Sequence, residues 1–224
     1  MAYINLTEDV KKLGVFLAYA TVGSVRVEKN RVDVLEHTKK IVKFDKETYN
    51  LENLTRHPLV RAYRRFMWSL KIDPTKIRPS SEALIRRILR TGNLRNINNV
   101  VDSGNFASAE TLIPIGIYDL NKITSELVLR HARKGELFRP IGGKDEFLLG
   151  NEVVLCDKEK ILHLFPYRDS AFTAVSENTH SVLIVAAGVP GVPKHLVIDA
   201  VRKTIRYVKL FAYGRNETEV NIVE

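Results

Sequence analysis

The residues with the clearest chemical meaning in this 224-residue chain are the arginines between positions 56 and 95. The segment holds eleven basic residues against two acidic ones, Asp73 and Glu82, so it accounts for the whole formal net charge of +9. The planar guanidinium of arginine suits phosphate and carboxylate well. Such a block is typical of a surface that binds a polyanion, whereas a merely solvated face usually mixes both signs. The arginines expected to contact nucleic acid are Arg61, Arg64, Arg65, Arg86, Arg87 and Arg90.

Three polar residues lie at the start of a predicted helix, for which Ser80 is the expected N-cap. Arg78, Ser81 and Glu82 could line a pocket there, because amide groups at a helix N-terminus favour an anion. The alternative is an ordinary cap with an acid that offsets the helix dipole. Both interpretations stay open.

Further polar candidates are Asn105 and the neighbours Arg168 and Asp169. The arginine and the aspartate form either a functional pair, in which the guanidinium polarises a carbonyl, or a structural ion pair. Asn105 is expected in a loop after a strand, where functional polar groups are common, although asparagine also suits turns. Asp119 is expected to anchor a turn.

Common catalytic and cofactor motifs are missing. The chain has no GxGxxG, no GxxxxGK[ST], no HExxH and no GxSxG. None of the six histidines has the short spacing of a zinc site, and His163 and Cys156 are expected to be buried. We therefore expect no metal and no nucleotide cofactor.

The elements that must position these residues are short strands and a few helices. Helical spacing of apolar residues predicts helices over 58–71 and from Ser80 to Gly92, and a last helix from Pro193 to just before Gly214. Two strands are predicted around Gly23 and Ser24, and further strands within 96–105, 126–132, 151–157, 160–165 and 180–188. Helices and strands do not alternate strictly, so the expected fold class is α+β, with a mixed or mostly antiparallel sheet and flanking helices.

Composition places the chain among cytoplasmic globular proteins. With the single cysteine Cys156, no internal disulfide can form. The longest apolar run, 13–22, is too short to span a bilayer, and the N-terminus lacks a signal-peptide layout. No linker or repeat is visible, so residues 1–224 are expected to form one domain with no membrane contact.

Four segments together resemble a known family. They are HPLVRAYRRFMWSLKIDPTKIRPSSEALIRRILR (57–90), NINNVVDSGNFASAETLIPIGIYDLNKI (96–123), LVLRHARKGELFRPIGGKDEFLLGNEVVLCD (127–157) and PYRDSAFTAVSENTHSVLIVAAG (166–188). In this order they resemble the B3/4 domain, the editing module of the phenylalanyl-tRNA synthetase β chain, which also occurs as small stand-alone proteins. RPSSEAL, VVD-x-x-N, P-x-G-x-YDL and YRDS-x-x-T are closest to the stand-alone group. The resemblance is strongest over 56–190.

The resemblance implies a protein that binds the 3′ end of a tRNA and hydrolyses a wrongly attached amino acid, which is tyrosine in the synthetase. It implies catalytic roles for Asn105, Arg168 and Asp169, and substrate-binding roles for Arg78, Ser81, Glu82, Gly116 and Tyr118. The class II motifs of the synthetase's catalytic module are missing, so the chain is not expected to aminoacylate tRNA.

Three departures from the synthetase pattern alter the expected site. Gly116 stands in place of a histidine, Arg168 in place of a glutamate, and Gly104 in place of a threonine. The frame of the pocket is thus similar while its polar lining differs, and the substrate amino acid does not follow from the resemblance.

Three functions remain as hypotheses. The first is hydrolysis of a mischarged aminoacyl-tRNA in trans, since a positioned water and donors for the oxyanion can cleave an activated ester without a side-chain nucleophile. The second is a non-catalytic module that binds an amino acid or an RNA end. The third is a small-molecule enzyme on the same fold.

Overall fold

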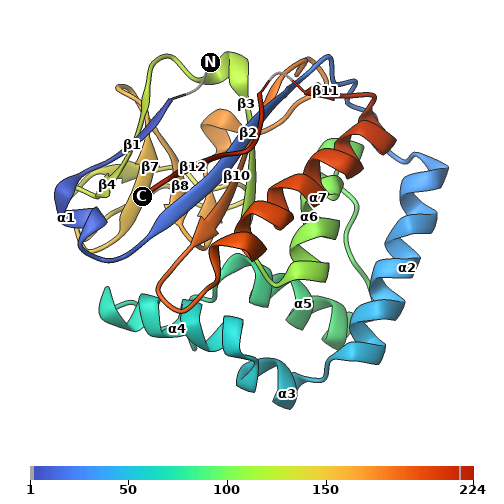
Figure 1. Cartoon of the computed structure of the whole chain (residues 1–224), viewed down its shortest axis with the longest axis horizontal. Helices are drawn as coiled ribbons and strands as arrows, with labels where there is room; N and C mark the ends of the chain where they lie inside the picture. Colours follow the sequence, from blue (N-terminus) through green and yellow to red (C-terminus); the bar gives the residue numbers. More distant parts are fainter. Residues whose placement is uncertain (1–2, 217) are drawn as a thin grey trace.

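Two β-sheets lie on one side of the molecule and most of the long helices on the other (Figure 1). The computed structural model describes residues 3–216 and 218–224. The first sheet has the strand order β1-β4-β7-β8-β9, with β1 parallel to β4 and the other neighbours antiparallel. The second has the order β11-β2-β10-β3, is antiparallel, and also pairs β12 with β2. The α+β class with mixed and antiparallel sheets is confirmed.

The strands are short apart from the two at the centre of the second sheet. Their bounds are β1 Ile4–Leu6, β2 Phe16–Gly23, β3 Ile115–Asp119, β4 Leu127–His131, β5 Leu137–Phe138, β6 Glu146–Phe147, β7 Val153–Cys156, β8 Ile161–Phe165, β9 Arg168–Asp169, β10 Val182–Gly188, β11 Arg215–Asn216 and β12 Asn221–Val223. Strands β5 and β6 form a separate hairpin.

Helices α6 and α7 lie against the second sheet, while α2 to α5 extend around the side and the bottom of the molecule (Figure 1). The helices are α1 Glu8–Lys11, α2 Val32–Thr48, α3 Leu51–Arg56, α4 Pro58–Ser69, α5 Ser80–Thr91, α6 Asn99–Thr111 and α7 Lys194–Ala212. The predicted helices at 58–71, 80–91 and after Pro193 are confirmed, and Gly92 ends α5 in the left-handed conformation. One detail is wrong, because Pro79 and not Ser80 occupies the N-cap of α5.

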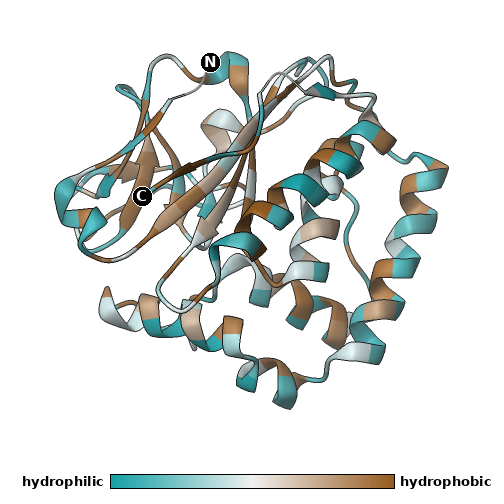
Figure 2. Cartoon of the chain, in the orientation of Figure 1, coloured by the Kyte–Doolittle hydropathy of each residue, from teal (hydrophilic) through white to brown (hydrophobic). Residues whose placement is uncertain are grey.

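The main core lies between the two sheets and under α7. Every residue of β2 and of β10 is buried. One apolar cluster joins both sheets to residues of α7, so these two strands are covered on both faces and their sequences are continuous apolar runs. Figure 2 shows this as hydrophobic colour along the central strands, while α7 carries both colours.

Two predicted strands are absent. Residues 24–29 form no strand. Ser24 has a left-handed backbone conformation, and Val25 and Val27 are buried without a strand partner among the described residues. The amide of Glu28 and the carbonyl of Arg26 bond instead to the side chain of Asn99, which replaces a ladder partner.

The segment 96–105 contains no strand, because residues 99–105 form the first half of α6. The Asn98 side chain accepts hydrogen bonds from the amides of Val100 and Val101 and so caps the helix. The apolar pair at 100 and 101 therefore belongs to a helical turn.

A tight turn after β8 brings the β8–β9 hairpin next to the start of α5. β8 and β9 form a hairpin, and the amide of Ser80 at the start of α5 donates to the carbonyl of Pro166 in its turn at 3.2 Å. The first turn of α5 consequently lies beside this hairpin.

Candidate functional site

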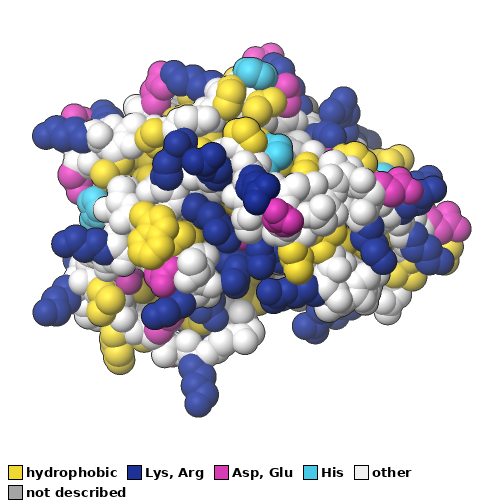
Figure 3. Space-filling model, turned by 90° about the horizontal axis from the view of Figure 1, so that it is seen from below, with side chains coloured by type: hydrophobic (Ala, Val, Ile, Leu, Met, Phe, Trp, Pro, Cys, Tyr) yellow, Lys and Arg dark blue, Asp and Glu magenta, His cyan; other side chains and the backbone are white. Residues whose placement is uncertain are grey.

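Arginines of α4 and α5 divide into an outer and an inner group. The outer basic face consists of Arg61, Arg65, Arg87 and Arg90, which are exposed. Figure 3, which views the molecule from the side of α3, α4 and α5, shows Lys and Arg side chains gathered on this surface. Trp68 is 55% exposed on α4. It follows Arg61 and Arg65 at helical spacing, so the three side chains share one stripe of α4.

The inner group turns toward α5. Arg64 donates to both oxygens of Glu82, from Nε at 2.8 Å and from Nη2 at 2.5 Å, and the glutamate is fully buried. Arg78 and Arg86 flank the same carboxylate. We call Arg64, Arg78 and Arg86 around Glu82 the inner arginine cluster. It links α4 to α5, so Arg64 and Arg86 do not share the exposure of the other predicted RNA-binding arginines.

A second polar group connects β3 to the β8–β9 hairpin. The hydroxyl of Tyr118 donates to Oδ1 of Asp169 at 2.9 Å, and Nδ1 of His163 lies 2.9 Å from the same oxygen. We call these residues the Tyr118–His163–Asp169 group. Register places His163 directly opposite Asp169 in the hairpin.

Burial sets the chemistry of this group. Tyr118 is 1% exposed, and desolvation, with the nearby charge of Asp169, holds the pKa of its hydroxyl well above the ordinary value, so it stays a donor. The side chain of Asp169 is 36% exposed and that of His163 is 9% exposed. A neutral His163 that donates from Nδ1 carries its lone pair on Nε2, as a general base requires.

The Tyr118 side chain occupies its position only because residue 116 is a glycine. Gly116 and Tyr118 alternate with Ile117 along β3 and lie on one face of it, and a Cβ at position 116 would collide with the Tyr118 hydroxyl. On the other face, a Cβ at Gly104 would come within 2.8 Å of Ile117 Cδ1. The tyrosine therefore fills the space beside position 116, and no histidine fits there in this arrangement.

Arg168 and Asp169 do not form the predicted pair. Asp169 bonds Tyr118 and His163, whereas Nη1 of Arg168 lies 3.6 Å from Oε1 of Glu146 in β6. Neighbouring residues of a strand point to opposite faces, which explains the separation. The side chain of Arg168 is 43% exposed.

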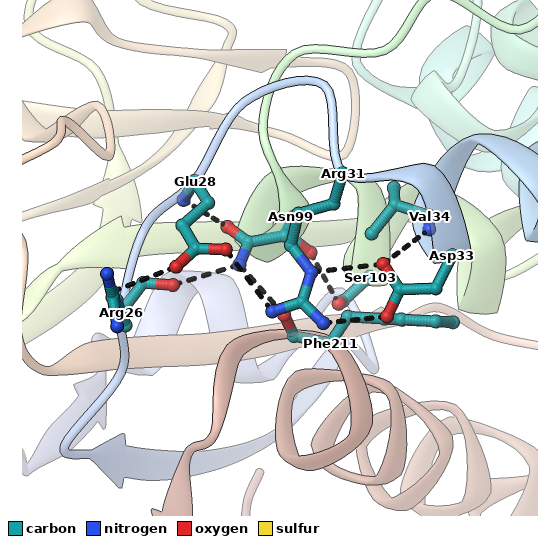
Figure 4. A network of polar contacts seen from close by, with 8 residues as sticks. All are labelled: Arg26, Glu28, Arg31, Asp33, Val34, Asn99, Ser103 and Phe211. Carbon is teal, nitrogen blue, oxygen red and sulfur yellow. Dashed lines mark hydrogen bonds and ion pairs between the residues drawn. The ribbon is translucent and has the colours of Figure 1, made fainter.

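The expected loop position of Asn105 is wrong, since it lies within α6, one turn after Asp102. Figure 4 shows how the helix is held nearby. The Asn99 amide donates to the carbonyls of Arg26 and Phe211, and its oxygen accepts from the amide of Glu28. This network positions the helix that carries Gly104 and Asn105.

The remaining residues singled out in the sequence, Asp119, Ser81 and Cys156, are held by hydrogen bonds or are buried in the fold. Asp119 caps the turn at Leu120–Lys122 and accepts from Thr179 at 2.7 Å, as expected for a turn anchor. Ser81 is buried beside Glu82. Cys156 is buried, and burial raises the pKa of its thiol.

From the sequence, His163 was expected to be a core or pocket residue and was not named among the site residues. The signal that could have identified it is its spacing from Asp169 in KILHLFPYRDS. A hairpin whose turn is centred on Pro166 brings positions 163 and 169 opposite each other.

Asp45 on α2 is a buried acid. Both of its oxygens are shielded and lack a hydrogen bond among the described residues. Desolvation, with the nearby charge of Glu110, raises the pKa of Asp45 to about 7 from 3.8. Between about pH 4 and pH 7 the folded protein therefore holds a proton on Asp45 that the unfolded chain has already released.

Stability should consequently fall as the pH rises through this window. We expect Asp45→Asn to stabilise the protein by roughly 1–4 kcal/mol at pH 8, with the gain shrinking toward pH 4. Urea unfolding at pH 4, 6 and 8 measures it, with exposed Asp199→Asn as the control. A gain independent of pH would contradict this prediction.

No group of three or more His, Cys, Asp or Glu side chains in the described part of the chain could hold a metal ion. Within the same residues, no helix is long and apolar enough to cross a membrane.

Comparisons with known proteins point to one family. The B3/4 domain model matches residues 62–211. The phenylalanine--tRNA ligase beta subunit of Carboxydothermus hydrogenoformans is 31% identical over 159 residues, which are 70% of this chain and 19% of that protein. The same subunit of Fusobacterium nucleatum is 29% identical over 162 residues, 71% of this chain and 19% of that protein. The chain thus spans about a fifth of the length of these relatives.

A solved structure shares the fold. It is an N-terminal fragment of the phenylalanyl-tRNA synthetase beta-subunit from Pyrococcus horikoshii, with a TM-score of 0.53 and 16% sequence identity. The match covers 99% of this chain and 50% of that one.

Proposed function

This chain belongs to the B3/4 domain family, and from that premise we propose that it binds the charged end of a tRNA and hydrolyses a mischarged aminoacyl ester in trans. The relatives that share the domain are phenylalanine--tRNA ligase beta subunits, so tRNA is the ligand that the family favours. The observation that carries the hydrolytic part is the Tyr118–His163–Asp169 group.

The chemistry requires a base, a water and a polarised ester. In the proposed step, Nε2 of His163 takes a proton from water as the water oxygen attacks the carbonyl carbon. The bond from that carbon to the ribose oxygen then breaks, and the proton passes to the ribose oxygen. Asp169 holds the imidazole and stabilises its charged form, as a carboxylate does beside a catalytic histidine. The products are a free amino acid and an uncharged tRNA.

The departures give this site its own substrate preference. Because Tyr118 fills the space beside Gly116, the proposed aminoacyl group lies outside that ring. Arg168, on the opposite face of β9 from Asp169, is proposed to contact the substrate away from the reacting carbonyl.

The direct test is deacylation. The purified protein is incubated with a panel of correctly charged and mischarged tRNAs, and release of the amino acid is followed over time. We expect at least one mischarged tRNA to lose its amino acid faster than it does spontaneously. A spontaneous rate for every aminoacyl-tRNA would end the proposal of an enzyme.

A non-catalytic binding module is the second candidate. It is favoured by one observation, that Gly116 and Tyr118 leave no room for the histidine of the synthetase pattern. Under this alternative, Asp169→Asn weakens binding of the aminoacyl group and changes no rate.

RNA affinity is proposed to come from the outer basic face. Changing Arg61, Arg65 and Arg87 together to glutamine should weaken tRNA binding about tenfold or more, and should lower the slope of log affinity against log salt by about 0.7–0.9 per lost phosphate contact. Filter binding at several salt concentrations measures both. Arg64 is left unchanged, because its removal would leave the buried carboxylate of Glu82 without its hydrogen-bonded guanidinium group.

The matched control changes three exposed cations of α7, Arg202, Arg206 and Lys209, to glutamine. This variant loses the same net charge from a different helix. If both triple variants weaken tRNA binding equally, the interaction follows net charge alone and the proposed surface is wrong.

A further inference from the structure

The inner arginine cluster has more positive charge than its single carboxylate can neutralise. Oε1 of Glu82 lies 3.6 Å from Nη1 of Arg86 and 3.9 Å from Nε of Arg78, in addition to its bond with Arg64. The side chains of Arg64, Arg78 and Arg86 are 22%, 29% and 15% exposed. Three guanidinium groups and one carboxylate leave a net charge of two positive in a region with little access to water.

The hydrogen bonds are distributed unequally. Arg64 takes both oxygens of Glu82, and the distances to Arg78 and Arg86 are too long for good hydrogen bonds. Nε of Arg78 and both Nε and Nη1 of Arg86 are buried without a hydrogen-bond partner among the described residues. Buried donors are nearly always satisfied in folded proteins, so unsatisfied donors on two arginines of one cluster require an explanation, and an acceptor from outside the chain is one.

The local field is also unfavourable for Arg86 without a ligand. Burial lowers the pKa of Arg86, and the charges of Arg78, Arg90 and Arg64 lower it further, while Glu82 raises it. Within the cluster, Glu82 lies in the first turn of α5, near the positive end of the helix dipole, and Pro79 supplies no side-chain cap there. An anion would relieve each of these costs.

We propose that the inner arginine cluster binds one phosphate group, with Arg78 and Arg86 as its principal donors and Arg64 held in place by Glu82. A phosphate offers several acceptor oxygens and one to two negative charges, which match the unpaired guanidinium nitrogens and the excess charge. The group could come from the backbone of an RNA strand or from a small phosphate compound. The RNA source rests on the proposed function, whereas the site itself does not require hydrolysis.

The test compares phosphate with chloride at equal ionic strength. Inorganic phosphate should raise the Tm of the wild-type protein and bind in calorimetry, and Arg86→Met should lower that affinity at least tenfold. Arg206→Met, which removes an exposed arginine of α7 outside the proposed binding surfaces, is the matched control and should bind phosphate like the wild type. No phosphate effect beyond that of chloride, or undiminished binding by Arg86→Met, would overturn the proposal.

Stability without ligand separates a binding role from a structural one. If Arg86 serves a ligand, Arg86→Met in phosphate-free buffer should melt at or above the wild-type temperature, because it removes an uncompensated buried charge. A structural ion pair predicts a lower Tm, and that result would count against the site.

Competition then identifies the source. Inorganic phosphate should displace a single-stranded RNA oligonucleotide if the strand supplies the group, and Arg86→Met should bind that RNA more weakly. If phosphate binds but does not compete with RNA, the ligand is a small phosphate compound. Both outcomes support the site. Deacylation is measured separately, so a failure of the proposed editing activity would leave this result unchanged.

Discussion

Asp169→Asn is expected to lower the rate of aminoacyl-ester hydrolysis by about 10³- to 10⁴-fold and to leave tRNA affinity nearly unchanged. The carboxylate accepts hydrogen bonds from both Tyr118 and His163 through one oxygen. An asparagine can still accept at that oxygen, but it carries no charge to stabilise the imidazolium that forms during proton transfer. The tRNA is proposed to be held elsewhere, by the outer basic face, so binding and rate should separate.

Single-turnover deacylation and filter binding measure the two effects, and thermal melts check the fold. Asp145→Asn is a suitable control, because this exposed carboxylate lies in the nearby β5–β6 hairpin and pairs with Arg139. Should Asp169→Asn hydrolyse as fast as the wild type, the Tyr118–His163–Asp169 group is a structural network and not a catalytic one.

Glu82→Gln is expected to destabilise the fold by about 3–5 kcal/mol, which corresponds to a fall in Tm of roughly 10 °C for a chain of this size. The substitution keeps the volume of the side chain but leaves three guanidinium groups with no carboxylate. Arg64 would lose both of its charged hydrogen bonds, and the contact between α4 and α5 would carry uncompensated charge.

Differential scanning calorimetry measures this loss. Glu52→Gln on α3 is the control, because Glu52 makes an exposed pair with Arg56 and such pairs contribute little. Phosphate should restore part of the stability of Glu82→Gln. An unchanged Tm would mean that the inner arginine cluster does not hold the helices together.

Amphipathic helices were predictable where apolar spacing was regular. In α4, Tyr63, Phe66 and Met67 are buried as expected, and the arginines between them point elsewhere. Helix α2 had no predicted counterpart. Its inward positions Val34, Thr38, Ile41 and Asp45 mix polar with apolar residues, so the sequence shows no continuous apolar stripe.

Side-chain capping explains the failure at 96–105. Val100 and Val101 are adjacent apolar residues of a kind common in strands, and no local pattern reveals that Asn98 and Asn99 satisfy backbone groups that a strand would pair. The partners of Asn99 are distant in the sequence, at Arg26 and Phe211. Such contacts become visible only when the chain is folded.

The candidate site was predictable as a region but not as a set of contacts. The stretch YRDS led to Asp169, and the pattern around Gly116 led to Tyr118, yet the aspartate was expected to pair with Arg168. Its partners are His163, across a hairpin, and Tyr118, from the other sheet. The hairpin register follows from local spacing only if the turn is placed at Pro166, and the packing of the two sheets is not encoded in local spacing at all.

Trp68 gives the outer basic face an optical reporter of its own. It is the only tryptophan in the chain, it is 55% exposed, and it shares one stripe of α4 with Arg61 and Arg65. Its emission therefore comes from this surface and not from the apolar core. A base that stacks on the indole would quench this fluorescence, so arrival of a nucleic acid at α4 can be timed without any attached dye.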